Sequence, residues 1–141
     1  MHPTLVEIDN DASRTFNVFF YGLYMDADIL ASRNVVARDP RIAYIDGHVV
    51  KLGEKAKLLR STNGRAHGML FRLTHGEMKS LYGVVHGYSA EPFLAVTADG
   101  QTVAAISMVQ VSLVLHPPPD PGYAERWNEL VVKLGLPNSK Y

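Results

Sequence analysis

The sequence contains no cysteine, and this absence excludes several kinds of site at once. Disulfides, thiolate zinc sites and cysteine nucleophiles all require that residue. The six histidines show no i, i+4 or clustered spacing of the kind that ligates metals. A glycine-rich phosphate loop is also missing. We therefore expect no metal and no other cofactor.

The chain also lacks a net charge, because 14 Lys and Arg residues balance 14 Asp and Glu residues. A neutral chain lacks the excess of positive charge that binds nucleic acid. Its copies also repel one another only weakly, so a homodimer is possible. No apolar run is long enough for a membrane span. Residues 1–15 hold three acids and no apolar stretch, unlike a secretory signal. We expect a cytoplasmic protein without nucleic-acid or membrane partners.

What is present is typical of one globular domain. The chain has 141 residues, of which 47% are hydrophobic and 20% charged. A chain of this size buries roughly 68–70% of its unfolded surface, enough for a core without covalent staples. We expect residues 1–15 to form a flexible leader and residues 16–141 to form the folded domain.

The first expected element is a buried strand. Residues 16–21 read FNVFFY, rich in β-branched and aromatic types, and end at Gly22, a strand breaker. Asp26 is then placed to N-cap a short helix, because its carboxylate can accept from the first free backbone N–H groups. This predicts a strand, a sharp turn and a helix in immediate succession.

Further strands are expected in the middle of the chain. Asp39-Pro40 predicts a break. Strand-like residues follow at 42–52 and 56–60, and Asn63-Gly64 is a turn signal. Residues 67–73 (HGMLFRL) predict another buried strand.

The second half begins with a helix and a hairpin. Thr74 and Glu77 have the spacing of a capping box and predict a helix over 76–82. Asp99-Gly100 is a hairpin signal that separates strand-like residues at 93–98 from those at 102–115.

The chain ends in an amphipathic helix. Trp127, Leu130, Val131 and Leu134 follow i, i+3, i+4, i+7 spacing, so we expect them to pack in the core, and Gly135 is placed as the C-terminal cap. The order of elements predicts an α+β fold, a small mixed or antiparallel sheet curled into a barrel with short flanking helices.

The turn after the first strand resembles a family signature. Residues 21–26 read Tyr-Gly-Leu-Tyr-Met-Asp, and the gamma-glutamylcyclotransferase family opens with Tyr-Gly-Ser-Asn-Leu/Met followed by a short helix. Leu23 and Tyr24 replace Ser and Asn. Residues 68–73 (GMLFRL) and the Gly-Leu-Pro at 135–137 resemble later segments of the same family, in the same order.

This resemblance implies a small mixed β-barrel whose turn binds the carboxylate of a γ-glutamyl group. Consecutive backbone amides at a strand-to-helix turn form an anion nest, whatever side chains they carry. We therefore expect a small-molecule carboxylate ligand. Its predicted binding residues are Tyr21, Gly22, Leu23, Tyr24 and Met25.

The family's catalytic glutamate has no counterpart here. The family reaction releases 5-oxoproline and needs a group that carries a proton from the attacking amine to the leaving nitrogen. The family motif Leu-Asp-x-x-Glu-Gly aligns with residues 81–87 (LYGVVHG). Val85 takes the place of the glutamate without a gap, and His86 takes it with a one-residue gap. Glu91 is the nearest downstream acid.

Three functions stay open at this point. We favour a non-catalytic relative that binds a small carboxylate. An active gamma-glutamyl amine cyclotransferase would use His86 or Glu91 as its base, although a loop histidine and a solvated loop acid are the simpler interpretations. An interaction protein would use a sheet edge or the Pro117–Pro121 loop.

Overall fold

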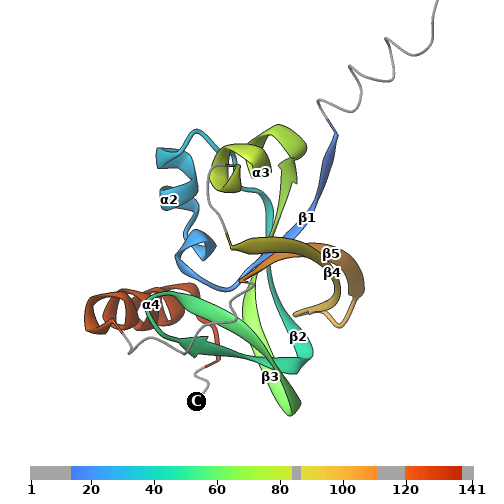
Figure 1. Cartoon of the computed structure of the whole chain (residues 1–141). Coiled ribbons are helices and arrows are strands. Elements are labelled where there is room, and N and C mark those ends of the chain that lie inside the picture. The colour runs from blue at the N-terminus through green and yellow to red at the C-terminus, as the bar shows by residue number, and fades with distance from the viewer. Residues whose placement is uncertain (1–13, 84–86, 111–119, 138–141) are drawn as a thin grey trace, which may run out of the picture.

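A computed structural model describes residues 14–83, 87–110 and 120–137. In these ranges, five strands form a closed barrel in the order β1-β3-β2-β4-β5 (Figure 1). Neighbouring strands are antiparallel, except that β1 meets β5 in parallel at Val18 and Ile106, which closes the barrel. The strands are β1 (Thr15–Phe20), β2 (Arg38–Leu52), β3 (Ala56–Thr74), β4 (Tyr88–Thr97) and β5 (Thr102–Gln110). This confirms the small mixed barrel expected from the sequence.

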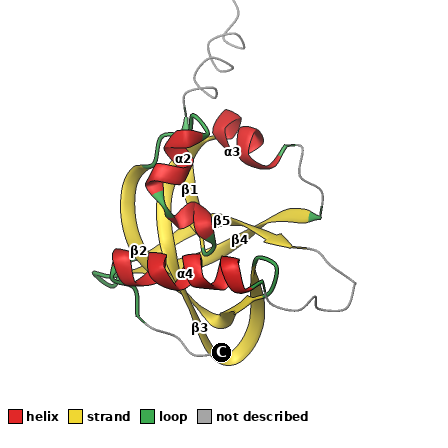
Figure 2. Cartoon of the chain, turned by 90° about the vertical axis from the view of Figure 1, so that its left-hand side faces the viewer, coloured by secondary structure: helices red, strands yellow, loops and turns green. Residues whose placement is uncertain are grey.

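The helices lie on the outside of the barrel. They are the short 3-10 helix η1 (Leu23–Met25), α2 (Ala27–Ser32), α3 (His75–Tyr82) and α4 (Pro121–Leu134). In both views α2 and α3 lie side by side at one end of the barrel, and α4 lies across its side (Figures 1 and 2). None of the helices that the structure describes is long and apolar enough to cross a membrane.

The expected caps and the hairpin turn are confirmed. The Asp26 carboxylate accepts from the Asp28 amide at 2.9 Å and begins α2. Thr74 and Glu77 form both hydrogen bonds of the capping box at the start of α3. Gly135 ends α4 with φ +73°. The hairpin joins β4 to β5 around Gly100, which has φ +87°.

Two interruptions of the strands that we predicted from the sequence, a break at Asp39-Pro40 and a turn at Asn63-Gly64, were wrong. Strand β2 runs through Asp39-Pro40, where the register shifts as in a β-bulge. Strand β3 is continuous over 19 residues and runs through Asn63-Gly64, opposite a second register shift in β2. A bulge bends a strand and increases its twist without reversing it. At Gly64, a Cβ atom would lie 2.6 Å from Val49 Cγ1, so the glycine permits close approach of β2.

The core fills the barrel and the space beneath the helices. The predicted apolar face of α4 is buried at Trp127, Leu130 and Val131. The largest fully buried side chains include Phe19, Phe71, Met25, Leu30, Leu70, Leu73 and Leu81. Of the Pro117–Pro121 loop, the structure describes only residues 120 and 121, which begin α4. Most of the expected leader and the expected strand end at 111–115 also lie outside the described residues.

Candidate functional site

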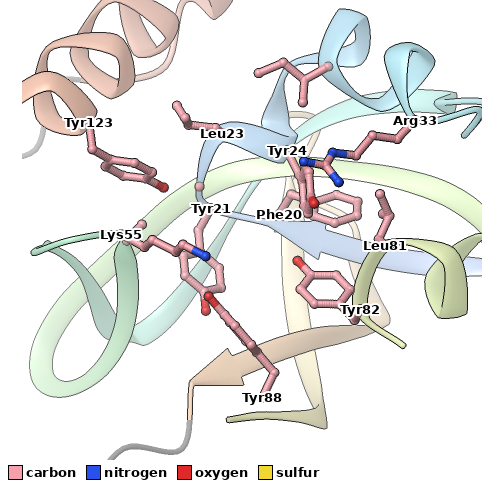
Figure 3. Close-up of a pocket in the computed structure, with 13 residues that line it drawn as sticks. Phe20, Tyr21, Leu23, Tyr24, Arg33, Lys55, Leu81, Tyr82, Tyr88 and Tyr123 are labelled. Carbon is pink, nitrogen blue, oxygen red and sulfur yellow. The ribbon is translucent and has the colours of Figure 1, made fainter. Parts of the chain in front are cut away.

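A cavity of about 250 Å³ lies beside Gly22, where the chain leaves β1 and enters η1. Six separate parts of the fold contribute to its wall, so it forms only when the barrel and all its helices are assembled. The wall consists of residues 20–24 of the turn together with Ile29, Arg33, Lys55, Ala56, Leu81, Tyr82, Tyr88 and Tyr123 (Figure 3).

The turn is held by its own backbone. The Gly22 carbonyl accepts from the Met25 amide, and the Leu23 carbonyl accepts from the Asp26 amide, each at 3.0 Å. Four of the five binding residues predicted from the sequence, those at 21–24, line the cavity. Met25 does not line it, because its side chain is fully buried in the core.

The hydroxyl of Tyr123 covers part of this turn. A Cβ atom on Gly22 would lie 2.9 Å from the Tyr123 oxygen, so glycine is the residue that lets the hydroxyl come close. Burial raises the pKa of Tyr123, and hydrogen bonds from the backbone of Ala56 and Leu23 oppose that rise. A ligand that approaches the turn therefore meets the Tyr123 hydroxyl, whose oxygen already accepts hydrogen bonds from these backbone N–H groups. Because both backbone N–H groups donate to its oxygen, the Tyr123 hydroxyl keeps its own proton as a hydrogen-bond donor.

A second tyrosine, Tyr21, is held by hydrogen bonds at its side-chain hydroxyl and at its backbone carbonyl. The Tyr21 hydroxyl donates to the Met108 carbonyl at 2.7 Å, and the Tyr21 carbonyl accepts from Trp127 Nε1 at 2.8 Å. Burial raises the pKa of Tyr21, and nearby Tyr88 and Tyr123 raise it further. Burial likewise raises the pKa of Tyr82. These phenols stay protonated at neutral pH and act as hydrogen-bond donors rather than bases.

Aromatic rings form a connected wall. The ring centroids of Phe20 and Tyr24 are 6.0 Å apart, those of Tyr24 and Tyr82 are 5.7 Å apart, and those of Tyr82 and Tyr88 are 5.4 Å apart. The first two pairs meet edge to face, a favourable arrangement for aromatic rings. This chain of rings connects the turn to the end of α3 and the start of β4.

Among the described residues, the charged members of the cavity wall are Arg33 and Lys55. They enter from opposite sides, Arg33 from the C-terminal end of α2 and Lys55 from the connection between β2 and β3 (Figure 3). The Arg33 guanidinium lies 5.6 Å from the centroid of the Tyr24 ring. Within the described chain, neither residue forms an ion pair. As far as the structure describes it, the wall therefore presents positive charge without a fixed counter-charge, which favours an anion.

Of the two predicted bases, the structure describes only Glu91. His86 lies outside the described residues, as does Val85. Glu91 belongs to β4 and lines a separate groove. In the ranges that the structure describes, no group of three or more histidine and acidic residues is placed to hold a metal ion.

Several wall residues were not singled out as site residues from the sequence, namely Arg33, Lys55, Tyr82, Tyr88 and Tyr123. They come from different elements, and their spacing in the chain shows no pattern. The one signal in the composition was the number of tyrosines. The chain has seven, and five of them line this cavity.

No family model matches the sequence, and no curated protein matches it. Solved structures do match. A gamma-glutamyl cyclotransferase superposes with a TM-score of 0.74 over 88% of this chain and 82% of its own, at 17% identity.

Two further structures agree. An uncharacterized protein from Homo sapiens has a TM-score of 0.72 and 19% identity, over 87% of this chain and 82% of its own. A protein from Arabidopsis thaliana, solved in solution, has a TM-score of 0.65 and 20% identity, over 89% of both chains. Identities this low establish the architecture rather than the activity. The chain has the gamma-glutamyl cyclotransferase-like fold.

Proposed function

We propose that this protein binds a small carboxylate-bearing ligand of the γ-glutamyl type in the cavity beside Gly22, without the cyclisation chemistry. The observation that carries the proposal is the charge of the wall. Arg33 and Lys55 are both positive, and no acidic residue lines the cavity in the described chain. A carboxylate is attracted to such a wall, and a cation is repelled.

The Tyr123 hydroxyl supplies the direct contact in this proposal. Its oxygen accepts from the backbone N–H groups of Leu23 in the turn and Ala56 in β3, which orients its O–H away from them and makes it a stronger donor. A ligand carboxylate accepts that proton in a charge-assisted hydrogen bond. The cavity, at about 250 Å³, is close to the lower end of the roughly 300–1,000 Å³ range of ligand sites and suits a small metabolite.

The same wall is poorly equipped for catalysis. Forming 5-oxoproline requires a group that takes a proton from the attacking amine and returns it to the leaving nitrogen. Tyr21 and Tyr82 hold their protons because burial raises their pKa values. Residues of the described wall include neither a carboxylate nor an imidazole.

A second candidate function is an active gamma-glutamyl amine cyclotransferase. Its support is the structural likeness to a protein of that name, at a TM-score of 0.74. In this case His86 is the proton carrier, since Glu91 lines another groove. The enzyme would release 5-oxoproline and a free amine.

Calorimetric titration with γ-glutamyl amines and with simple carboxylates tests binding. We expect binding by the wild type, and at least tenfold weaker binding by Arg33→Gln and Lys55→Gln. Lys51→Gln is the matched control, because Lys51 is exposed and does not line the cavity. If no carboxylate binds the wild type, the proposal is wrong.

A 5-oxoproline assay on the same compounds separates the two functions. We expect no release above the uncatalysed rate. Release that disappears in His86→Ala but persists in Glu91→Gln would establish the cyclotransferase instead.

A further inference from the structure

Strands β2 and β4 separate soon after they meet. Within the described residues their ladder holds only two pairs, Ala43 with Thr97 and Tyr44 with Val96. Beyond these pairs, β2 continues with β3, while β4 curves away with β5 (Figure 1). Pro92 lies in the part of β4 that leaves β2, where a residue without a backbone N–H is tolerated. A groove of about 650 Å³ opens between the separated strands, away from the Gly22 cavity.

The register of β4 and β5 turns Glu91 toward the barrel interior. Residues directly opposite each other on paired strands share a face of the sheet. Glu91 pairs with Ser107, which is fully buried and donates to the Phe19 carbonyl. Two residues further along β4, Phe93 pairs with buried Ala105. Glu91 is exposed despite its inward direction, because the barrel is open at this point.

The opposite side of the groove carries two more inward polar residues. His48 of β2 pairs with Arg60 of β3, two positions from the buried pair of Val50 and Leu58. Side chains two positions apart on a strand share a face, so His48 and Arg60 also face inward. The His48 ring meets the Phe93 ring edge to face across the opening, with centroids 5.3 Å apart. All three polar residues line the same groove.

The charges in this groove are opposite but separate. Three charged residues line it, and one of them, Asp46, is already paired with Arg65 at 2.9 Å. Glu91 and Arg60 form no ion pair with each other in the described chain, so their charged atoms lie more than 4.0 Å apart. The remaining wall is largely apolar and includes Ile45, Leu58, Phe93 and Val109. A ligand with an ammonium group, a carboxylate and an apolar side chain complements all three features. The Gly22 cavity, which has cations alone, does not.

We propose that this groove is a second binding site, for an α-amino acid with an apolar side chain. Glu91 receives the ammonium group, Arg60 receives the carboxylate in a charge-assisted contact, and the side chain lies against Phe93. Barrel mouths are common ligand sites, and the groove volume falls within the usual range of roughly 300–1,000 Å³. The site does not depend on the function proposed for the Gly22 cavity.

Inward charges beside open strand edges have another known use, which is to prevent edge-to-edge association. That role requires charge but no ligand. The two interpretations differ in a measurable way, because only a binding site discriminates between ligands that lack one of the two charged groups.

The test is an NMR titration of the full chain with three probes: L-leucine, 4-methylpentanoate, which lacks the ammonium group, and 3-methylbutylamine, which lacks the carboxylate. We expect leucine to bind at least tenfold more tightly than either analogue. Amide shifts should change around Glu91 and Arg60. Arg33→Gln and Lys55→Gln should leave leucine binding unchanged, which separates this site from the first.

Two variants then test which residue binds which charged group of the ligand. Glu91→Gln should remove the preference for leucine over 4-methylpentanoate, and Arg60→Gln should remove the preference over 3-methylbutylamine. Glu125→Gln and Arg126→Gln are matched controls outside the groove. The proposal is overturned if leucine causes no shifts at millimolar concentration, if it binds no better than its analogues, or if both variants keep the wild-type preferences. An increase in self-association of Glu91→Gln without leucine binding would assign the edge-protecting role instead.

Discussion

The indole nitrogen of Trp127 donates a buried hydrogen bond to the backbone carbonyl of Tyr21 at 2.8 Å. This bond joins α4 to the residue that follows β1, immediately before the turn that bounds the cavity. It couples the position of the last helix, and hence of Tyr123, to the Gly22 turn.

Trp127→Phe removes the donor and leaves the Tyr21 carbonyl buried without it. An unsatisfied buried acceptor costs about 1–3 kcal/mol, and the lost volume adds to that loss. We expect the free energy of unfolding in urea to fall by at least this amount. Val132→Ala on the exposed side of the same helix should change it little. Equal losses in the two variants would contradict the importance of this hydrogen bond.

Tyr123→Phe distinguishes two ways of binding a carboxylate. The Tyr123 hydroxyl can act as a relay, in which its oxygen accepts from the backbone N–H groups and its proton is donated to the ligand carboxylate. In that case, its removal should weaken binding about tenfold. If the hydroxyl only blocks the amides, its removal should strengthen binding, because the Leu23 amide becomes free for the anion. We expect the weaker binding, measured by calorimetry. An affinity that rises would disprove the relay.

Gly22→Ala should destabilise the protein through contact with Tyr123. The backbone at Gly22, with φ −108°, is accessible to any residue, so conformational strain is not the cause. The added Cβ atom would lie 2.9 Å from the Tyr123 hydroxyl oxygen, and crowding of this kind costs about 1–3 kcal/mol. In a double-mutant cycle, Tyr123→Phe should relieve part of that cost. Strict additivity would show that the contact does not limit the turn.

Glu77 should make stability depend on pH below neutrality. Burial raises its pKa, but hydrogen bonds from Arg38, Thr74 and Val36 outweigh burial and lower the pKa to about 2. The distance from Arg38 Nη1 to Glu77 Oε1 is 2.7 Å. Because the pKa in the folded state lies below the ordinary glutamate value of 4.5, the stabilisation is complete above that value. It is lost as the pH falls toward 2.

Glu77→Gln removes this titration. We expect the variant to lose on the order of 2–3 kcal/mol at pH 7 and to show a flatter dependence of unfolding free energy between pH 5 and 2. Glu125→Gln, on the exposed surface of α4, is the control. An unchanged slope in Glu77→Gln would mean that other carboxylates cause the acid sensitivity.

The sequence alone determined those features that depend on near neighbours in the chain. The Asp26 cap, the box of Thr74 and Glu77 and the Gly135 end of α4 involve hydrogen bonds or conformations within a few residues, so local chemistry was sufficient. Residues 21–25 were singled out through the family resemblance of this contiguous segment, and residues 21–24 line the cavity. The barrel followed from the order of these elements and from the family resemblance.

Tertiary structure decided what depends on register and on closure of the barrel. Asn63-Gly64 reads locally as a turn, yet pairing with β2 carries the strand through it. Lys55 and Tyr123 meet Gly22 only because separate elements converge on one turn. Glu91 faces another groove because its pairing with Ser107 sets its direction. Side-chain direction in a sheet changes with a shift of one residue, and long-range pairing, rather than local preference, selects the register.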